Sequence, residues 1–403
     1  MSQFKACPHG QHAAQSARRG HSARTLHIRP LVRQVHLWLG LTVGGLFAVL
    51  GLTGSALVFY VGIDEALNTP EFAATGTAAP DWDSPVWERV LATGLEQWPQ
   101  QGGKFSIEAT GNSGPIPARY YPPSQHHDHH AERLMLWFAP DGTSVIRADT
   151  WGDYLMSWLY ELHMHLLAGE TGRQIVGWSG FAMLVLLATG IAAWWPRGSW
   201  RKALAFKRHA VAQRRLRDLH KHAGLWSALV LFLLALTGAL LALPDVQSGL
   251  LAASVAPPEP VPAPLSTQSS GDQVRLSQAL ATARAALPDG RLAFIDVPVG
   301  GNDPIRLRIQ VPGDPHRRFP GSFVFIDQYS GSVLAVHDVR TGNGATQTAK
   351  WIRPIHDGSI AGMPTRILAV LVGLMPAALM ITGLLHWRKR RIARQRTPFH
   401  HHA

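Results

Sequence analysis

The feature that most constrains this chain is an apolar stretch at residues 33–60, RQVHLWLGLTVGGLFAVLGLTGSALVFY. It begins with basic residues and one histidine, and then stays apolar for the roughly 20 residues that a helix needs to cross a bilayer. The pattern recurs at residues 214–243 with a constant offset of 184 positions. The matches are His36 with His220, Gly40 with Gly224, and Thr53-Gly54 with Thr237-Gly238. The sequence therefore predicts a membrane protein in which one span and its histidine are duplicated.

A second pair of segments, residues 158–190 and 351–383, repeats in the same way with an offset of 193. The matches are Trp158 with Trp351, His163 with His356, Gly169 with Gly362, Arg173 with Arg366, and Thr189-Gly190 with Thr382-Gly383. Each copy leads into a further apolar run. We therefore expect a membrane α-helical fold with four transmembrane helices in two tandem halves.

The net charge of +12 does not indicate nucleic acid. Lys and Arg gather in three blocks, at residues 18–33, 197–221 and 388–396, and each block adjoins a predicted span. Basic residues flanking spans mark the cytoplasmic side. We therefore predict a multi-pass protein of the bacterial inner membrane with both termini in the cytoplasm and the lipid bilayer around its spans. The first apolar run is too long for a signal peptide and lacks a small-residue cleavage site, so it is interpreted as a retained span.

Between the spans lie two polar segments on the far side of the membrane. The second has a helix-like stretch at residues 276–286 followed by strand-like runs, which predicts a small α+β module with a helix packed on an antiparallel sheet. The expected division of the chain is a basic tail 1–32, span 33–60, module 61–157, interfacial helix and span 158–195, basic loop 196–219, span 220–243, module 244–350, interfacial segment and span 351–387, and basic tail 388–403.

Four histidines at symmetry-related positions are the candidate site residues. His36 and His220 lie at the cytoplasmic edge and His163 and His356 at the opposite edge. Two imidazoles that face each other in a helix bundle suit the bis-histidine ligation of a b-type haem, which favours electron transfer. The sequence thus predicts two such haems, and the lone Cys7 excludes the CxxCH attachment of a c-type haem as well as structural disulfides.

Two glycines support this prediction, because Gly40 and Gly224 follow the ligands by one turn, where a flat macrocycle could lie against the helix. Zinc is the rival for paired histidines, but no Cys or carboxylate completes a tetrahedral set within the spans. Histidines without a symmetric counterpart rank lower as ligands; they are His165, His222 and His386. The run HHDHH at residues 126–130 could bind a metal, although a solvated loop is the favoured interpretation.

The four histidine motifs resemble those of the PepSY-associated transmembrane family, which includes ferrisiderophore reductases. The motifs are RQVHLWLGL, LHMHLLAGETGR, RDLHKHAGLW and IHDGSIAGMPTR. The soluble segments are similar to PepSY modules, best seen at VFIDQYSGSVLAV, where Asp327 and Gly331 fit a strand–turn–strand. The first module diverges from that pattern, with FAPDGTSVI in its place.

This resemblance implies two periplasmic PepSY-like modules and a haem-dependent membrane oxidoreductase. Such a protein would take electrons from the cytoplasmic side and reduce an Fe(III)-siderophore, or another periplasmic ferric chelate, to release Fe(II). The chain has no GxGxxG between a strand and a helix, so the expected donor is a separate cytoplasmic reductase or a quinol. Two alternatives remain open: a non-enzymatic PepSY protein that binds or regulates a periplasmic partner, and a metal or haem carrier.

Overall fold

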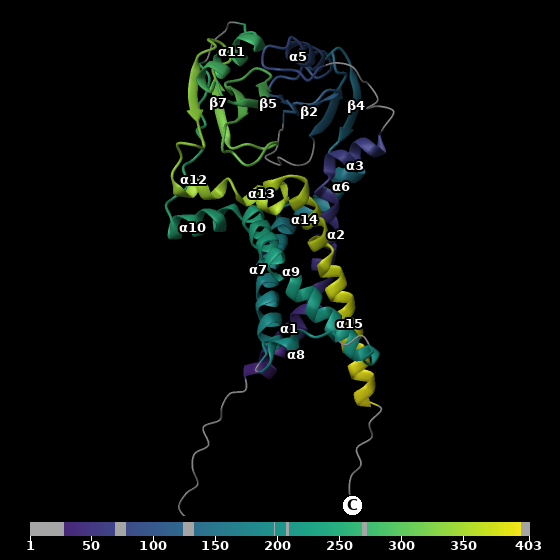
Figure 1. Ribbon diagram of the computed structural model, residues 1–403. Coiled ribbons are helices and arrows are strands. Elements are labelled where there is room, and N and C mark those ends of the chain that lie inside the picture. Colours follow the sequence, from purple (N-terminus) through teal and green to yellow (C-terminus); the bar gives the residue numbers. More distant parts are fainter. Residues whose placement is uncertain are drawn as a thin grey trace, which may run out of the picture.

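The computed structural model of the protein describes residues 28–68, 78–123, 133–196, 198–206, 209–267 and 272–395. It has two parts, a stem of long helices and a β-sheet domain at one end of the stem (Figure 1). The N-terminal end of α1, the short helix α8 and the C-terminal end of α15 lie at the other end (Figure 1). The three basic blocks of the sequence therefore adjoin the end of the stem that is remote from the sheet.

Three helices of the stem are long and apolar enough to cross a membrane, and a bent helix pair makes a fourth candidate if it counts as one span. The stem helices are α1 (Ile28–Thr42), α2 (Gly44–Leu57), α7 (Gly169–Trp194), α9 (Ala212–Ala242), α14 (Met363–Gly373) and α15 (Met375–Gln395). The run Met363–Ala393 counts as a single candidate although it spans α14 and α15.

The span expected at residues 33–60 is broken. Helices α1 and α2 meet at an angle of 58°, with Val43 between them at φ −106° and ψ −6°. The residues around this break explain it, because Gly44 and Gly45 weaken the helix and the Thr42 hydroxyl donates to the carbonyl of Trp38 at 2.8 Å. The matching span α9 has no such break over its 31 residues.

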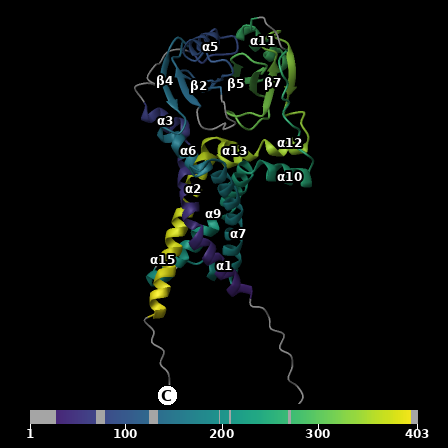
Figure 2. The same cartoon turned by 180° about the vertical axis from the view of Figure 1, so that it is seen from behind.

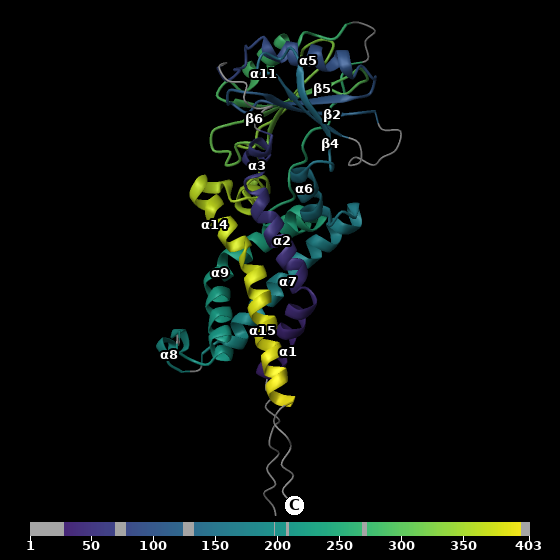
Figure 3. The same ribbon diagram turned by 90° about the vertical axis from the view of Figure 1, so that its right-hand side faces the viewer.

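Short helices connect the stem to the sheet (Figures 2 and 3). They are α3 (Tyr60–Leu67), α6 (Leu155–His165), α10 (Pro244–Ser254), α12 (Gly344–Ala349), α13 (Ile352–His356) and the 3-10 helix η1 (Ser359–Ala361). Helix α8 (Trp200–Leu204) belongs to the basic loop between α7 and α9. Helices α6 and α13 matter most for function, because each ends in or next to a candidate histidine.

The two polar segments form one continuous antiparallel sheet, in the order β4-β3-β2-β1-β5-β6-β7-β8. The strands are β1 (Lys104–Glu108), β2 (Ile116–Tyr121), β3 (Leu134–Phe138), β4 (Val145–Thr150), β5 (Arg291–Pro298), β6 (Ile305–Gln310), β7 (Ser322–Ile326) and β8 (Val333–His337). The sequence predicted two small modules. Their first strands pair with each other, from Lys104 opposite Pro298 to Glu108 opposite Phe294, so neither β1 nor β5 is left as an edge.

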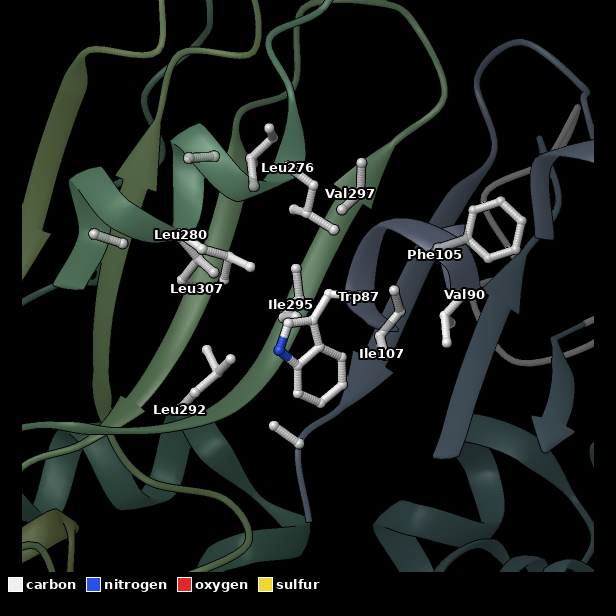
Figure 4. Packing of buried hydrophobic residues seen from close by; sticks show 14 of the residues in the cluster. Trp87, Val90, Phe105, Ile107, Leu276, Leu280, Leu292, Ile295, Val297 and Leu307 are labelled. Atoms are coloured by element: carbon white, nitrogen blue, oxygen red, sulfur yellow. The ribbon is translucent and has the colours of Figure 1, made fainter. Parts of the chain in front are cut away.

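One face of the sheet carries the apolar core. Helices α5 (Val86–Gln97) and α11 (Leu276–Ala286) cover this face. Trp87 of α5 and Leu280 of α11 are buried in the same cluster as Ile107 and Ile295 of the two central strands (Figure 4). Because side chains alternate along a strand, the intervening residues point to the opposite face, toward the stem. That second face is rich in arginine and aromatic residues.

Candidate functional site

The four symmetric histidines come together in two pairs. His36 of α1 and His220 of α9 have ring centroids 6.2 Å apart with planes at 82°. His163 of α6 and His356 of α13 have ring centroids 6.3 Å apart with planes at 40°. We call the first the tail-side pair and the second the sheet-side pair. Each pair takes one histidine from each half of the chain.

The spacing within each pair matches two imidazoles that share one metal ion. A metal bound at roughly 2 Å from each nitrogen, with a nitrogen roughly 1.1 Å from its ring centre, puts the two centroids about 6 Å apart. The centroid distances of 6.2 and 6.3 Å agree with this value.

Hydrogen bonds fix how the tail-side rings are oriented. Nδ1 of His36 donates to the Leu186 carbonyl at 3.1 Å, and Nδ1 of His220 donates to the Leu379 carbonyl at 3.0 Å. The hydroxyls of Thr189 and Thr382 lie 3.4 and 3.1 Å from these nitrogens. A carbonyl can only accept, so each ring carries its proton on Nδ1 and leaves Nε2 free as a ligand atom.

The sheet-side rings are held by the same arrangement. Nδ1 of His356 donates to the Leu234 carbonyl at 3.0 Å, and Nδ1 of His163 donates to the Thr53 hydroxyl at 3.0 Å. The Thr53 hydroxyl donates its own hydrogen bond to the Val49 carbonyl at 2.8 Å. It therefore acts as an acceptor for His163. Within the described residues, none of the four Nε2 atoms has a hydrogen-bond partner.

A Thr-Gly dipeptide lies against every one of the four rings. A Cβ added at Gly54 would lie 2.8 Å from Cε1 of His163, and one at Gly238 would lie 2.6 Å from Cε1 of His356. At Gly190 and Gly383 the corresponding distances to His36 and His220 are 2.9 and 3.3 Å. In the sequence these dipeptides occur at matching positions of the repeats. Their recurrence in all four spans indicates a structural role: the threonine hydroxyl can accept a hydrogen bond, and the glycine leaves space for the histidine ring.

The two pairs lie far apart along the stem. Helix α9 carries His220 itself and also Leu234, the residue that accepts the hydrogen bond from His356. The 14 positions between them correspond to about 21 Å at the rise of an α-helix. The pairs are therefore two sites at different depths of the stem, not one four-histidine centre.

The surroundings of the sheet-side pair are apolar. A cavity of about 150 Å³ contacts both His163 and His356, and its walls are mainly apolar and small residues of the stem, such as Leu231, Met183 and Gly51. Across the described residues, no group of three or more His, Cys, Asp or Glu could hold a metal ion. Two axial imidazoles in an apolar pocket fit a metal whose remaining ligands come from a macrocycle, whereas zinc would need three or four protein ligands.

Space is also open beside the two predicted glycines. A Cβ at Gly40 would approach only Leu186, at 4.0 Å, and one at Gly224 would approach only Leu379, at 3.6 Å. Both neighbours belong to residues whose carbonyls hold the tail-side rings. Each of these glycines therefore leaves open space one helical turn from a candidate ligand.

The lower-ranked histidines have other partners. Nδ1 of His165 lies 2.7 Å from the Glu161 carboxylate in α6, and both ring nitrogens of His222 lie within 2.8 Å of backbone carbonyls, those of Asp218 and Leu204. These rings hold local structure. His386 is partly buried on α15, one turn beyond Thr382. The run at residues 126–130 lies outside the described residues.

The sequence model of a protein family described as the PepSY-associated TM region matches residues 33–390, which include all four paired histidines. No curated protein matches the chain.

Proposed function

Because the chain belongs to the PepSY-associated TM region family, we propose that it is a di-haem b-type electron-transfer protein of the bacterial inner membrane. In this proposal it is an oxidoreductase that reduces a periplasmic ferric chelate, such as an Fe(III)-siderophore, with electrons from the cytoplasmic side. The observation that carries the proposal is the repeated histidine geometry. Two rings stand about 6 Å apart at each site, and each ring has its Nδ1 proton committed to an acceptor.

In the proposal, His36 and His220 hold one haem and His163 and His356 hold the other. When bound, a haem iron with two axial imidazoles supplies one-electron transfer, because neither axial position is open to oxygen. The carbonyls of Leu186, Leu379 and Leu234 keep three of the rings in the ligating tautomer, and a neutral Nδ1–H donor to an acceptor makes Nε2 more basic. The apolar walls of the cavity beside His163 and His356 would limit the access of water to the sheet-side site.

Charge supports the orientation. The basic residues at the end of the stem remote from the sheet favour a cytoplasmic location for that end under the positive-inside rule. The tail-side pair then lies near the cytoplasm and the sheet-side pair near the periplasm. A separate cytoplasmic reductase or a quinol would deliver electrons at the tail side, and the acceptor would dock beneath the sheet.

The proposed acceptor is bulky and polar, which suits the region between the sheet and the stem better than the apolar stem itself. Helices α6 and α13, which carry the sheet-side histidines, both lie in this region (Figure 1). In the proposal both histidines of a pair would hold the group, so an acceptor would be reduced from outside the histidine pocket. A ferric chelate held beneath the sheet meets that requirement.

The test begins with a pyridine haemochrome assay on the purified protein, for which we expect two non-covalent b-type haems per chain. The protein is then reduced anaerobically and mixed with an Fe(III)-siderophore and a ferrous trap. Haem reoxidation with matching Fe(II) release supports the proposal. A protein without haem, or with a c-type spectrum, contradicts it. Haems that stay reduced with every ferric chelate but reoxidise with another periplasmic acceptor would overturn the iron assignment and keep the electron path.

A further inference from the structure

The sheet face that looks toward the stem carries four arginines around one phenylalanine ring. The guanidinium carbons of Arg119, Arg308, Arg318 and Arg353 lie 5.8, 5.9, 5.2 and 5.5 Å from the centroid of Phe319. They come from β2, β6, the 311–321 loop and α13, so both halves of the sheet and a connecting helix contribute. We call these four residues the arginine cluster.

Carboxylates neutralise only part of this cluster. Glu108 accepts two hydrogen bonds from Arg318, at 2.7 and 2.9 Å, and lies 3.6 Å from Arg119. Burial alone would raise the pKa of Glu108, but the Arg318 guanidinium outweighs it and the pKa falls below its usual range. Glu108 is therefore a buried anion that is already committed to two of the four cations.

Arg308 and Arg353 have no such partner. Within the described residues, neither guanidinium forms an ion pair or a side-chain hydrogen bond. The two nearby carboxylates have other partners: Asp296 forms an ion pair with Arg306 at 2.5 Å, and Asp357 accepts a hydrogen bond from Nε2 of His316 at 2.8 Å. The arginine cluster therefore carries excess positive charge in a partly buried place.

The surroundings of Arg308 are rich in aromatic rings. Its guanidinium carbon lies 4.9 Å from the Phe323 centroid and 5.7 Å from that of Phe294, and Phe294 stacks on Phe319 at 5.6 Å with planes at 10°. Burial lowers the pKa of Arg308 to about 10, and Asp296 opposes this effect while Arg306 adds to it. The group still carries its charge near neutral pH. A fixed guanidinium fork without a counter-ion is suited to bind carboxylate-like oxygens.

The position of the cluster connects it to the sheet-side pair. Arg353 lies one helical turn before His356 in α13. We propose that the arginine cluster binds the negatively charged oxygens of the ferric chelate, so that the protein prefers anionic chelates to neutral or cationic ones. This inference rests on the proposed function, and it adds the charge of the substrate and the residue that recognises it, Arg308.

The test measures binding without electron transfer. Gallium(III) replaces iron because it has the same charge and is not reduced. The intact protein in uncharged detergent is titrated by calorimetry with a trianionic gallium tris-catecholate and with a neutral gallium tris-hydroxamate of similar size. We expect the anionic complex to bind more tightly and its affinity to fall with added salt. Arg308→Gln should weaken it by roughly tenfold or more, as expected for the loss of a charge-assisted hydrogen bond.

The chain offers a matched control. Arg306 lies two positions away on the same strand and the same face, and Asp296 already neutralises it. Arg306→Gln should leave the affinity for the anionic complex unchanged, and Arg308→Lys should retain most of it. Haem content and melting temperature report whether each variant is folded.

Three results would overturn the inference: equal affinity for the anionic and neutral complexes, no effect of Arg308→Gln in a folded protein, or an equal effect of Arg306→Gln. A further experiment compares chelate binding in nanodiscs of phosphatidylglycerol and of phosphatidylcholine. If phosphatidylglycerol abolished chelate binding and Arg308→Gln removed that competition, a lipid headgroup would be the anion and the substrate assignment would be wrong. Failure of the proposed function would be seen separately, as absent haem or absent Fe(II) release with gallium binding intact.

Discussion

The two halves of the chain build the same histidine arrangement on different helices. In the first half the span is split into α1 and α2 with a bend of 58°, whereas its counterpart α9 is one helix of 31 residues. Nevertheless the ring spacings at the two sites differ by only 0.1 Å (6.2 against 6.3 Å). The arrangement thus tolerates a change of helix path as long as a histidine, a carbonyl and a Thr-Gly dipeptide meet. It also shows that neither half can form a site alone.

The sheet, like the histidine sites, is built from both halves of the chain. Its central pairing joins β1 of the first half to β5 of the second half. The halves differ, however, in the loop that follows their second strand. In the second half the 311–321 loop bridges two regions: His316 contacts Asp357, next to the connecting helix α13, at 2.8 Å, and Arg318 contacts Glu108 of strand β1. The corresponding loop of the first half contains the histidine run at residues 126–130, outside the described residues. We therefore expect functional groups to concentrate in the second half.

The largest expected effect is the loss of one haem and not the other. His36→Ala or His220→Ala should remove the tail-side haem, and His356→Ala should remove the sheet-side haem, because the sites are about 21 Å apart along α9. Haem content should fall to half in each case. Electron paramagnetic resonance should identify the remaining haem, since the imidazole planes differ between the sites, at 82° and 40°.

His222→Ala is the matched control for His220→Ala. It lies two residues along α9, and its ring nitrogens already face the carbonyls of Asp218 and Leu204. It should keep both haems. A folded protein in which His220→Ala emptied both sites would contradict the two-site arrangement.

The next effect concerns the glycines beside the rings. Alanine should disturb each histidine in proportion to how close its Cβ would come. The strongest effect is expected at Gly238, where the Cβ would lie 2.6 Å from His356, and the weakest at Gly383, at 3.3 Å from His220. We expect Gly238→Ala to weaken haem retention by roughly 10–100-fold, as changes around a metal-ligating histidine do. Haem transfer to apomyoglobin measures this, and equal loss at both positions would refute the graded prediction.

Much of the site could be predicted because the chain is duplicated. One offset relates His36 to His220 and another relates His163 to His356, so their pairing by depth followed from the span pattern alone. The roles of Leu186, Leu379 and Leu234 could not be predicted. They act through backbone carbonyls, which every residue has, so the side chain carries no signal. The Thr-Gly dipeptides did carry one, through their occurrence in all four spans.

The break at Val43 and the continuity of the sheet could not be predicted from the sequence either. An apolar period predicts that a segment is helical, but it does not reveal where the helix bends, and Gly44 and Gly45 equally suit close helix packing. The strand-like runs predict that β1 and β5 are strands, and both are buried along nearly their whole length. These runs cannot tell which strand lies beside each one, because the partners are nearly 190 positions apart (Ile107 opposite Ile295) and share no turn.

A smaller effect should distinguish the two modules. Asp327 accepts hydrogen bonds from the backbone of Thr267, Tyr329 and Ser330 at 2.7, 2.8 and 2.9 Å. Burial opposes ionisation of Asp327, but these donors prevail and lower its pKa. Asp327→Asn should cost about 2 kcal/mol and lower the melting temperature by about 4–8 °C. Asp141, its counterpart in the first module, is exposed, and its carboxylate accepts hydrogen bonds from the amide and hydroxyl of Thr143 two positions on, so Asp141→Asn should leave the melting temperature unchanged.

The pH dependence follows from the sign of that shift. A carboxylate with a lowered pKa in the folded state stabilises the protein above its unfolded pKa of about 4, and this contribution disappears as the pH falls. The difference in melting temperature between Asp327→Asn and the unchanged protein should therefore be full at pH 7 and shrink below about pH 4. A difference that stayed constant into acid would mean that the side chain acts through its shape and not through its charge.

The smallest effect is expected in the first half, at residues 126–130. Four histidines and an aspartate in a loop fix no coordination geometry without a scaffold, so deleting His126–His130 should leave haem content and Fe(II) release nearly intact. His316→Ala in the matching loop of the second half should be more damaging, because that ring donates from Nε2 to Asp357 at 2.8 Å and accepts the Phe319 amide at 3.0 Å on Nδ1. Both variants are compared for haem content, melting temperature and turnover. The prediction would be wrong if the deletion removed most turnover from a folded protein while His316→Ala did not. The histidine run would then be a functional metal site.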